Sequence, residues 1–259
     1  MSVDYQALKA ENITRYGTDI GRIGKMLLAD RYDNRTHFIF ELLQNAEDAL
    51  RRRPSAWAGE RSVRFDLSAD QLVITHHGQP FDASDVKGVC GIDESTKTIT
   101  SIGRFGIGFK SVYSFTKRPE IHSGDEAFGI DTFVWPTSVE PIERTPSQTK
   151  IVLPLDADDK NAQAEIEEGL QGLGPRTLLF LRHIKEISWM VGGAPAGLYF
   201  RDDPKTLGHG VRQIALMGQQ DGREIEERWL VFSRSRQWRH PRWLRRDRVF
   251  SVCRTGCCA

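Results

Sequence analysis

Hydrophobic and polar positions follow a helical period over Thr36–Arg51, which reads THFIFELLQNAEDALR. Apolar residues recur three and four positions apart and form one broad face, which predicts an amphipathic helix. Glu41, Asn45 and Asp48 lie at i, i+4 and i+7, so their side chains share one line beside this face. An amide and carboxylates at the edge of a core need polar partners. A metal ion with a bound ligand would supply them, and a solvated stripe is the alternative.

Polar residues also mark both ends of this helix. Asp33 and Asn34 each suit its N-cap, because their side-chain oxygens can accept from the first free backbone N–H groups. At the other end, Arg51, Arg52 and Arg53 predict a solvated terminus that the helix dipole favours.

The rest of the chain mixes two periods. Alternation with a period of two, typical of strands, extends over residues 62–67, 71–75 and 147–155 and returns in irregular stretches beyond Gly192. A hairpin is predicted at Ser123–Asp125. Helical spacing recurs over residues 3–28, 85–91 and 157–183, the last interrupted by glycines and a proline. Together these patterns predict an α+β fold.

Glycines gather in the stretch SIGRFGIGFKSVY, residues 101–113. Gly103, Gly106 and Gly108 precede an apolar run, an arrangement that exposes backbone N–H groups at a helix N-terminus and suits a phosphate. A Walker A loop is excluded because Phe109 separates Gly108 from Lys110, and the Rossmann glycine spacing is absent as well. A tight turn is the alternative use of these glycines.

Composition narrows the class of protein. The chain has 259 residues, of which 39% are hydrophobic and 27% charged, as in globular proteins. A net charge of +1 gives no overall attraction to nucleic acid or to anionic membranes. No apolar run approaches the roughly 20 residues that span a bilayer, and the polar N-terminus lacks the core of a signal peptide, so a cytoplasmic location is expected. The four cysteines lack the two separated pairs of a zinc site and are expected to be free thiols.

The two stretches ELLQNAEDA and GRFGIGFKS together resemble the nucleotide-binding domain of the GHKL, or Bergerat-fold, ATPases, which gyrase, large heat-shock chaperones, histidine kinases and MutL share. Within that group the sequence is most similar to the sacsin-like and NO VEIN-like branch. The resemblance covers roughly residues 12–155. It implies a two-layer α/β sandwich in which a mixed, largely antiparallel sheet carries helices on one face. A partial second α/β region is expected to follow.

Domain boundaries are expected from the same resemblance. Residues 1–190 would form the ATP-binding domain, and residues 191–233 would begin a following domain. Residues 234–259 carry many arginines with Trp238 and Trp243 between them. Such a composition can bind single-stranded nucleic acid, and a basic tail without fixed structure is the alternative.

The resemblance implies roles for the polar line of the first helix, with ATP and Mg²⁺ as cofactors. Glu41 would act as the general base that takes a proton from the attacking water. Asn45 would hold Mg²⁺ through its side-chain oxygen. Asp48 would brace the base pocket or the helix.

The base-binding side departs from the family pattern. His76 occupies the position of an Asp that accepts a hydrogen bond from the adenine amino group, and Gly78 matches the first glycine that follows that Asp. Pro80 replaces the second glycine. A neutral imidazole can still accept one hydrogen bond. Thr149 matches a threonine that contacts the adenine side through water.

The phosphate side is implied to include a short lid and the glycine-rich loop. Lys97 in the lid would reach a phosphate, with a solvent-facing lysine as the alternative. The resemblance assigns phosphate binding to the loop residues Gly103, Arg104, Phe105, Gly106, Ile107, Gly108 and Phe109. Lys110, which follows them, would add a point charge to the phosphates.

The function expected from the resemblance is slow ATP hydrolysis that drives a chaperone-like or clamp-like conformational change. The alternative is a nucleotide-binding or interaction module with little or no hydrolysis, because His76 and Pro80 depart from the pattern. A histidine kinase is disfavoured, since residues 1–34 contain no histidine. Homodimerisation is implied only by the habit of the family, and the client, whether protein or nucleic acid, is not encoded in any motif.

Overall fold

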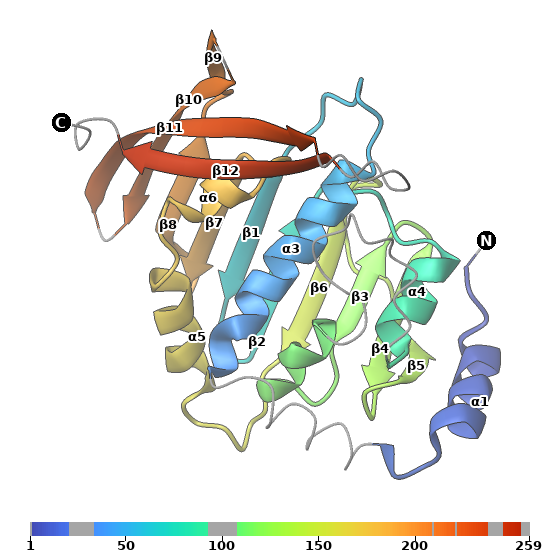
Figure 1. Ribbon diagram of the computed structural model, residues 1–259. Coiled ribbons are helices and arrows are strands. Elements are labelled where there is room, and N and C mark those ends of the chain that lie inside the picture. Colours follow the sequence, from blue (N-terminus) through green and yellow to red (C-terminus); the bar gives the residue numbers. More distant parts are fainter. Residues whose placement is uncertain are drawn as a thin grey trace.

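A long central helix organises the structure. The computed structural model describes residues 2–20, 34–92, 108–208, 210–220, 222–237 and 246–254. Helix α3 (Phe38–Arg51) crosses one face of a large sheet (Figure 1). Its apolar face is buried, with Phe38, Leu42 and Ala46 almost fully excluded from solvent. The predicted helix is confirmed, although its first turn, Arg35–His37, is a 3₁₀ turn whose N-cap is Asn34. The Asn34 side chain accepts from the Thr36 N–H at 2.8 Å.

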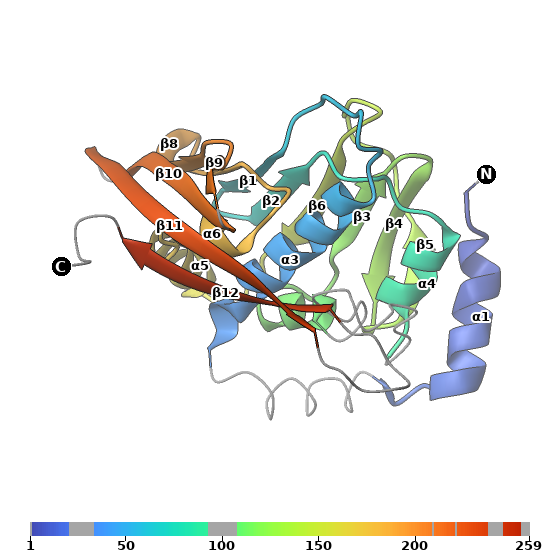
Figure 2. The same ribbon diagram turned by 45° about the horizontal axis from the view of Figure 1, so that its top comes forward.

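Four further helices and one further 3₁₀ turn accompany α3 in the described residues. The helices are α1 (Tyr5–Tyr16), α4 (Ala83–Cys90), α5 (Ala162–Gln171) and α6 (Thr177–Phe180), and the turn is Phe109–Ser114. Figures 1 and 2 place α4 and α5 on the same side of the sheet as α3, whereas α1 lies beside the edge strand β5. The buried Asn12 ties α1 to this edge, because its amide donates to the carbonyls of Cys90 and Val134.

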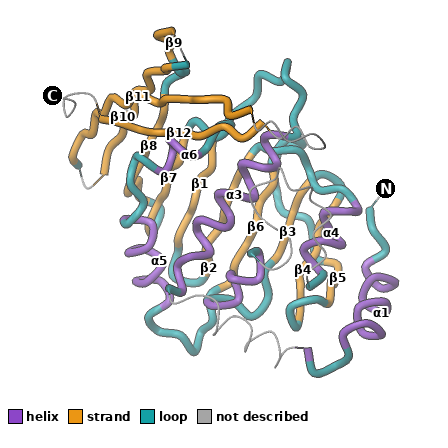
Figure 3. The backbone as a smooth tube through the Cα atoms, in the orientation of Figure 1, coloured by secondary structure: helices purple, strands orange, loops and turns teal. Residues whose placement is uncertain are grey.

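The strands form one mixed sheet (Figure 3). They are β1 (Ser62–Leu67), β2 (Gln71–His76), β3 (Glu120–Ser123), β4 (Glu126–Asp131), β5 (Trp135–Ser138), β6 (Thr149–Pro154), β7 (Glu186–Val191), β8 (Ala194–Arg201), β9 (Lys205–Gly208), β10 (Val211–Gln220), β11 (Arg223–Gln237) and β12 (Arg246–Arg254). Their order is β12-β11-β10-β8-β7-β1-β2-β6-β3-β4-β5, with β9 paired to β10. Only β1 and β7 pair in parallel among the described strands. The predicted α+β class and the largely antiparallel sheet are therefore confirmed.

Several local predictions are confirmed as well. Strands β1 and β2 form the expected hairpin, and β3 and β4 form the second one. Gly124 turns that second hairpin with φ +57°, a conformation that glycine adopts without strain. The interrupted helical segment divides into α5 and α6 at its glycines and proline.

The C-terminal third continues the sheet that carries α3. Strand β7 pairs in parallel with β1 from Ser62 to Leu67, and β8 and β10 then extend the same sheet. The segment expected to begin a following domain is thus hydrogen-bonded to the sheet that carries α3. Part of the expected basic tail forms β12, which pairs antiparallel with β11. Arginine composition does not reveal such backbone pairing within the sheet.

Candidate functional site

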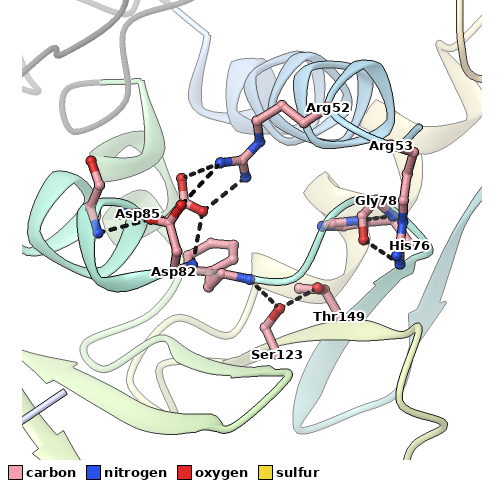
Figure 4. Close-up of polar contacts among 10 residues, drawn as sticks. Arg52, Arg53, His76, Gly78, Asp82, Asp85, Ser123 and Thr149 are labelled. Atoms are coloured by element: carbon pink, nitrogen blue, oxygen red, sulfur yellow. Dashed lines mark hydrogen bonds and ion pairs between the residues drawn. The ribbon is translucent and has the colours of Figure 1, made fainter. Parts of the chain in front are cut away.

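Three strands meet below the C-terminal end of α3 and align a row of polar side chains. His76 on β2 pairs with Thr149 on β6, and Thr149 pairs with Ser123 on β3. All three side chains are buried. The hydroxyls of Ser123 and Thr149 lie 2.5 Å apart, and Ser123 Oγ accepts from the Phe81 N–H at 3.0 Å (Figure 4). The structure therefore brings together the two residues predicted to face the base, His76 and Thr149.

The side chain of His76 is tied to its own turn. Its Nδ1 accepts a hydrogen bond from the Gly78 N–H at 3.1 Å. Burial, with smaller contributions from the neighbouring His77, Arg52 and Arg53, lowers the pKa of His76 to about 3. The ring is therefore neutral at physiological pH, as the sequence argument assumed, but one of its two nitrogens already has a partner.

Gly78 allows the turn after β2 to touch α3. A Cβ at this position would lie 2.4 Å from the Cβ of Ala49 and 2.8 Å from its carbonyl carbon, closer than packed carbons approach. The next residue, Gln79, donates its backbone N–H to the Ala49 carbonyl at 2.9 Å. The glycine that the resemblance assigned to base approach thus also holds the turn against the helix.

Gly78→Ala is expected to destabilise the fold by about 1–3 kcal/mol, because α3 and the turn would have to separate. Chemical denaturation of the two proteins measures the difference. Gly174→Ala is the matched control, since a Cβ there meets no atom within 4 Å. Equal destabilisation by both substitutions would show that the close approach at Gly78 carries no special strain.

Two arginines at the C-terminal end of α3 form contacts that were not predicted from the sequence. Arg53 contacts the turn after β2, and Arg52 contacts α4. Arg53 donates to the carbonyls of His77 (3.0 Å), Gly78 (2.9 Å) and Ser147 (3.1 Å). Arg52 forms a two-pronged ion pair with Asp85, at 3.0 and 2.9 Å (Figure 4). The exposure of Arg52 agrees with the expected solvated helix end, whereas Arg53 is part-buried, and neither set of partners was expected.

Asp85 offered a signal that sequence reasoning could have used. It closes a capping box with Asp82 at the start of α4, in which each side chain accepts from the backbone of the other. An Asp-x-x-Asp pair before an apolar run is a variant of the capping-box pattern. The ion pair between Asp85 and Arg52 could not be predicted from that spacing.

The other end of the site joins Glu41 to the end of the glycine-rich stretch. A Cβ on Gly108 would lie 2.1 Å from Glu41 Oε2, so a larger residue there would displace the carboxylate from this position. His37 lies one turn earlier on the helix, with Nε2 3.3 Å from Glu41 Oε1. The Glu41 side chain is 18% exposed. The predicted base thus lies against Gly108, the glycine at the end of the predicted phosphate loop.

Asn45 lies one turn after Glu41 and is half-buried. Within the part of the chain that the structure describes, its amide forms no hydrogen bond with protein, so its oxygen is available to a ligand. Asp48 is buried and lies 3.4 Å from Arg51 Nη2, an i,i+3 pair along the helix. This pairing agrees with the expected bracing role of Asp48.

Lys110 and Phe109 both point into the protein interior. Lys110 donates from Nζ to the carbonyls of Val89 and Phe133, which joins α4 to the segment between β4 and β5. Burial lowers the pKa of Lys110 to about 8. Phe109 is buried in the core. The phosphate contact expected of Lys110 would require its ammonium to leave both carbonyls.

The expectations for Lys97, Gly103, Arg104, Phe105, Gly106 and Ile107 lie outside the described residues.

His76 also predicts a pH dependence of stability. Its pKa is about 3 in the folded chain against an ordinary value of 6.5, so below pH 6.5 the unfolded chain binds a proton that the folded chain excludes. The free energy of unfolding is therefore not reduced by His76 above pH 6.5. As the pH drops from 6.5 toward 3, protonation of the unfolded chain lowers the free energy of unfolding by about 1 kcal/mol per pH unit. His76→Asn should therefore flatten the decline in unfolding free energy between pH 6.5 and 5. An unchanged decline would contradict the neutral, buried ring.

Comparison with known proteins identifies similar sequences. Residues 20–140 match the family model described as Sacsin domain. Protein NO VEIN of Arabidopsis thaliana is 31% identical over 192 residues, which cover 64% of this chain and 7% of that protein. Residues 20–140 are therefore similar to a sacsin domain. Human sacsin is 29% identical over 132 residues, 45% of this chain and 3% of sacsin. The predicted resemblance to the sacsin and NO VEIN branch is confirmed.

The chain is also similar to bacterial chaperones. Chaperone protein HtpG of Sulfurovum sp. (strain NBC37-1) is 24% identical over 177 residues, 56% of this chain and 28% of the chaperone. The chain thus spans less than a third of the length of each of these relatives. Among the described helices, none has the length and hydropathy needed to cross a membrane.

Proposed function

We propose that this chain binds ATP with Mg²⁺ between α3 and the sheet, in a pocket of the Bergerat type, and hydrolyses the nucleotide slowly. The meeting of Glu41 with Gly108 carries this proposal. It joins a carboxylate one helical turn from Asn45 to the end of a glycine-rich stretch. A base, a metal ligand and a phosphate-binding backbone at one place are the parts that nucleotide hydrolysis needs.

The residues present fit a magnesium ion. Asn45 supplies a neutral oxygen that has no protein partner among the described residues, and Mg²⁺ prefers oxygen ligands while keeping several waters. One protein ligand with phosphate oxygens therefore completes a site. When bound, the ion would neutralise charge on the phosphates. No group of three or more His, Cys, Asp or Glu side chains in the described residues forms a competing metal site.

Glu41 is proposed to accept the proton of the attacking water. The carboxylate is mostly shielded from solvent, which strengthens its hydrogen bonds. His37 holds one of its oxygens, so the other, Oε2, faces Gly108 and the incoming water. Backbone N–H groups of the glycine-rich loop, with Gly103, Gly106 and Gly108 in the family positions, are proposed to stabilise the phosphate charge.

The remaining roles follow the same proposal. His76, Gly78 and Thr149 would line the base side, and Asp48 would brace the helix. Hydrolysis would drive a chaperone-like or clamp-like change, in a cytoplasmic homodimer, through the strands beyond residue 190 that continue the sheet. Lys97 is proposed to reach a phosphate, and Lys110 would do so only after its ammonium leaves the carbonyls of Val89 and Phe133.

The test is steady-state ATP turnover by the purified chain. We expect slow turnover that requires Mg²⁺ and stops when the metal is removed with EDTA. Turnover that persists in EDTA would contradict the proposed site, and fast turnover without any partner would contradict the slow clamp.

A second candidate function is nucleotide binding without hydrolysis. Two observations favour it: Lys110 is held by two backbone carbonyls, and His76 replaces a carboxylate. Glu41→Ala separates the candidates, because a binding module would behave identically with and without this carboxylate.

A further inference from the structure

The hydrogen-bonding sense of His76 is determined by the backbone around it. A backbone N–H can only donate, so the contact from Gly78 N–H leaves the lone pair on Nδ1 and the single proton of a neutral ring on Nε2. A doubly protonated ring would set two donors against each other at Gly78. The free nitrogen of His76 is therefore a donor.

The turn that imposes this state is rigid. Arg53 holds the carbonyls of His77 and Gly78, and Gly78 packs against Ala49 of α3. The ring itself is 3% exposed. The hydrogen bond from the Gly78 N–H can be accepted only by Nδ1, the ring nitrogen nearer the backbone. If the ring were flipped, a carbon atom would face the Gly78 N–H. In the described part of the chain, no group accepts from Nε2.

We propose that His76 presents a hydrogen-bond donor to the base, so that this pocket binds a 6-oxopurine nucleotide, such as ITP or GTP, more tightly than ATP. The inference rests on the proposed function, in which His76 faces the 6-substituent of the purine. A carboxylate at this position would use one oxygen for the Gly78 N–H and offer the other to a 6-amino group. The imidazole offers an N–H, which repels an amino group and pairs with an oxo group.

The experiment compares the dissociation constants of ATP and ITP, whose bases differ in hydrogen-bonding sense along the C6 edge. The titrations are made by calorimetry with Mg²⁺ present. They use the Glu41→Gln variant, because this substitution prevents turnover during the measurement. We expect ITP to bind at least about tenfold more tightly than ATP. His76→Asp should reverse the preference, because it restores an acceptor. His76→Asn should retain it, because one amide oxygen can serve Gly78 while the amide N–H faces the base.

The Asp and Asn variants have nearly the same size, so a difference between them reports hydrogen-bonding sense and not folding. His77→Asn is the control, since His77 is paired with Glu60 at 2.9 Å, and it should leave the ratio unchanged. A wild-type preference for ATP, or equal ratios in the Asp and Asn variants, would overturn the inference while leaving the proposed function intact. Absence of binding by both nucleotides would overturn both.

A second readout needs no variant. Nitrogen-15 NMR of the histidine side chains distinguishes the two neutral tautomers, with His76→Asn supplying the assignment. We expect His76 to carry its proton on Nε2. A proton on Nδ1 would overturn the inference even if nucleotides bind.

Discussion

Replacing Glu41 with alanine is expected to lower ATP turnover by about 10²- to 10⁴-fold, the usual contribution of a general base. Nucleotide binding should persist, because Glu41 Oε2 lies against Gly108 and not beside the base-binding row of His76 and Thr149. Turnover and calorimetric affinity, measured on the same preparations, separate the two effects.

Two controls sharpen this prediction. Glu168→Ala removes an exposed carboxylate from α5 and should change neither quantity. Glu41→Gln keeps the shape of the side chain without its basicity, so it should lose turnover nearly as fully as alanine. If Glu41→Gln retained wild-type turnover, the carboxylate would be a structural contact to the loop and not a base.

The largest loss of stability is expected from Glu47→Ala. The Glu47 carboxylate is buried and accepts backbone N–H groups from Arg182 (2.6 Å), His183 (2.9 Å) and Ile184 (2.9 Å). It thereby joins α3 to the segment that leads into β7. Removing it leaves three backbone donors without this acceptor, of which that of Ile184 is buried and the other two are part-buried, so we expect a loss of about 3–5 kcal/mol in the free energy of unfolding.

Chemical denaturation measures this loss directly. Glu47→Gln retains one acceptor oxygen and should fall between alanine and wild type. Glu168→Ala again serves as the surface control. A loss below about 1 kcal/mol in Glu47→Ala would mean that water replaces the carboxylate and that this junction adds little to the fold.

Glu47 also shows how far the sequence could lead. Helix α3 was predictable, since its apolar period is strong, and so was the line of Glu41, Asn45 and Asp48. Glu47 stands within the same motif, yet its partners lie about 135 residues further along the chain. No local spacing encodes such a contact. The parallel pairing of β1 with β7 is equally distant in sequence, so no local pattern reveals that the strands beyond residue 190 continue the same sheet.

Part of the candidate site could also be predicted from the sequence, and part could not. The proximity of Glu41 and Gly108 followed from the family resemblance, not from periodicity, and the structure now gives it a physical reason in the missing Cβ of Gly108. The position of the proposed base side follows from the resemblance, whereas its chemistry does not. That His76 can accept a hydrogen bond is a property of imidazole, whereas the nitrogen that accepts is decided by the turn at Gly78.

The most direct test of the central claim is calorimetric titration of the chain and of Asn45→Ala with Mg²⁺ and a non-hydrolysable ATP analogue. We predict that the wild type binds the analogue only with Mg²⁺, and that Asn45→Ala weakens binding by at least about tenfold. Asn161→Ala, an exposed asparagine before α5, should have no effect. Equal affinity of wild type and Asn45→Ala, or binding that is indifferent to Mg²⁺, would contradict a nucleotide site on α3.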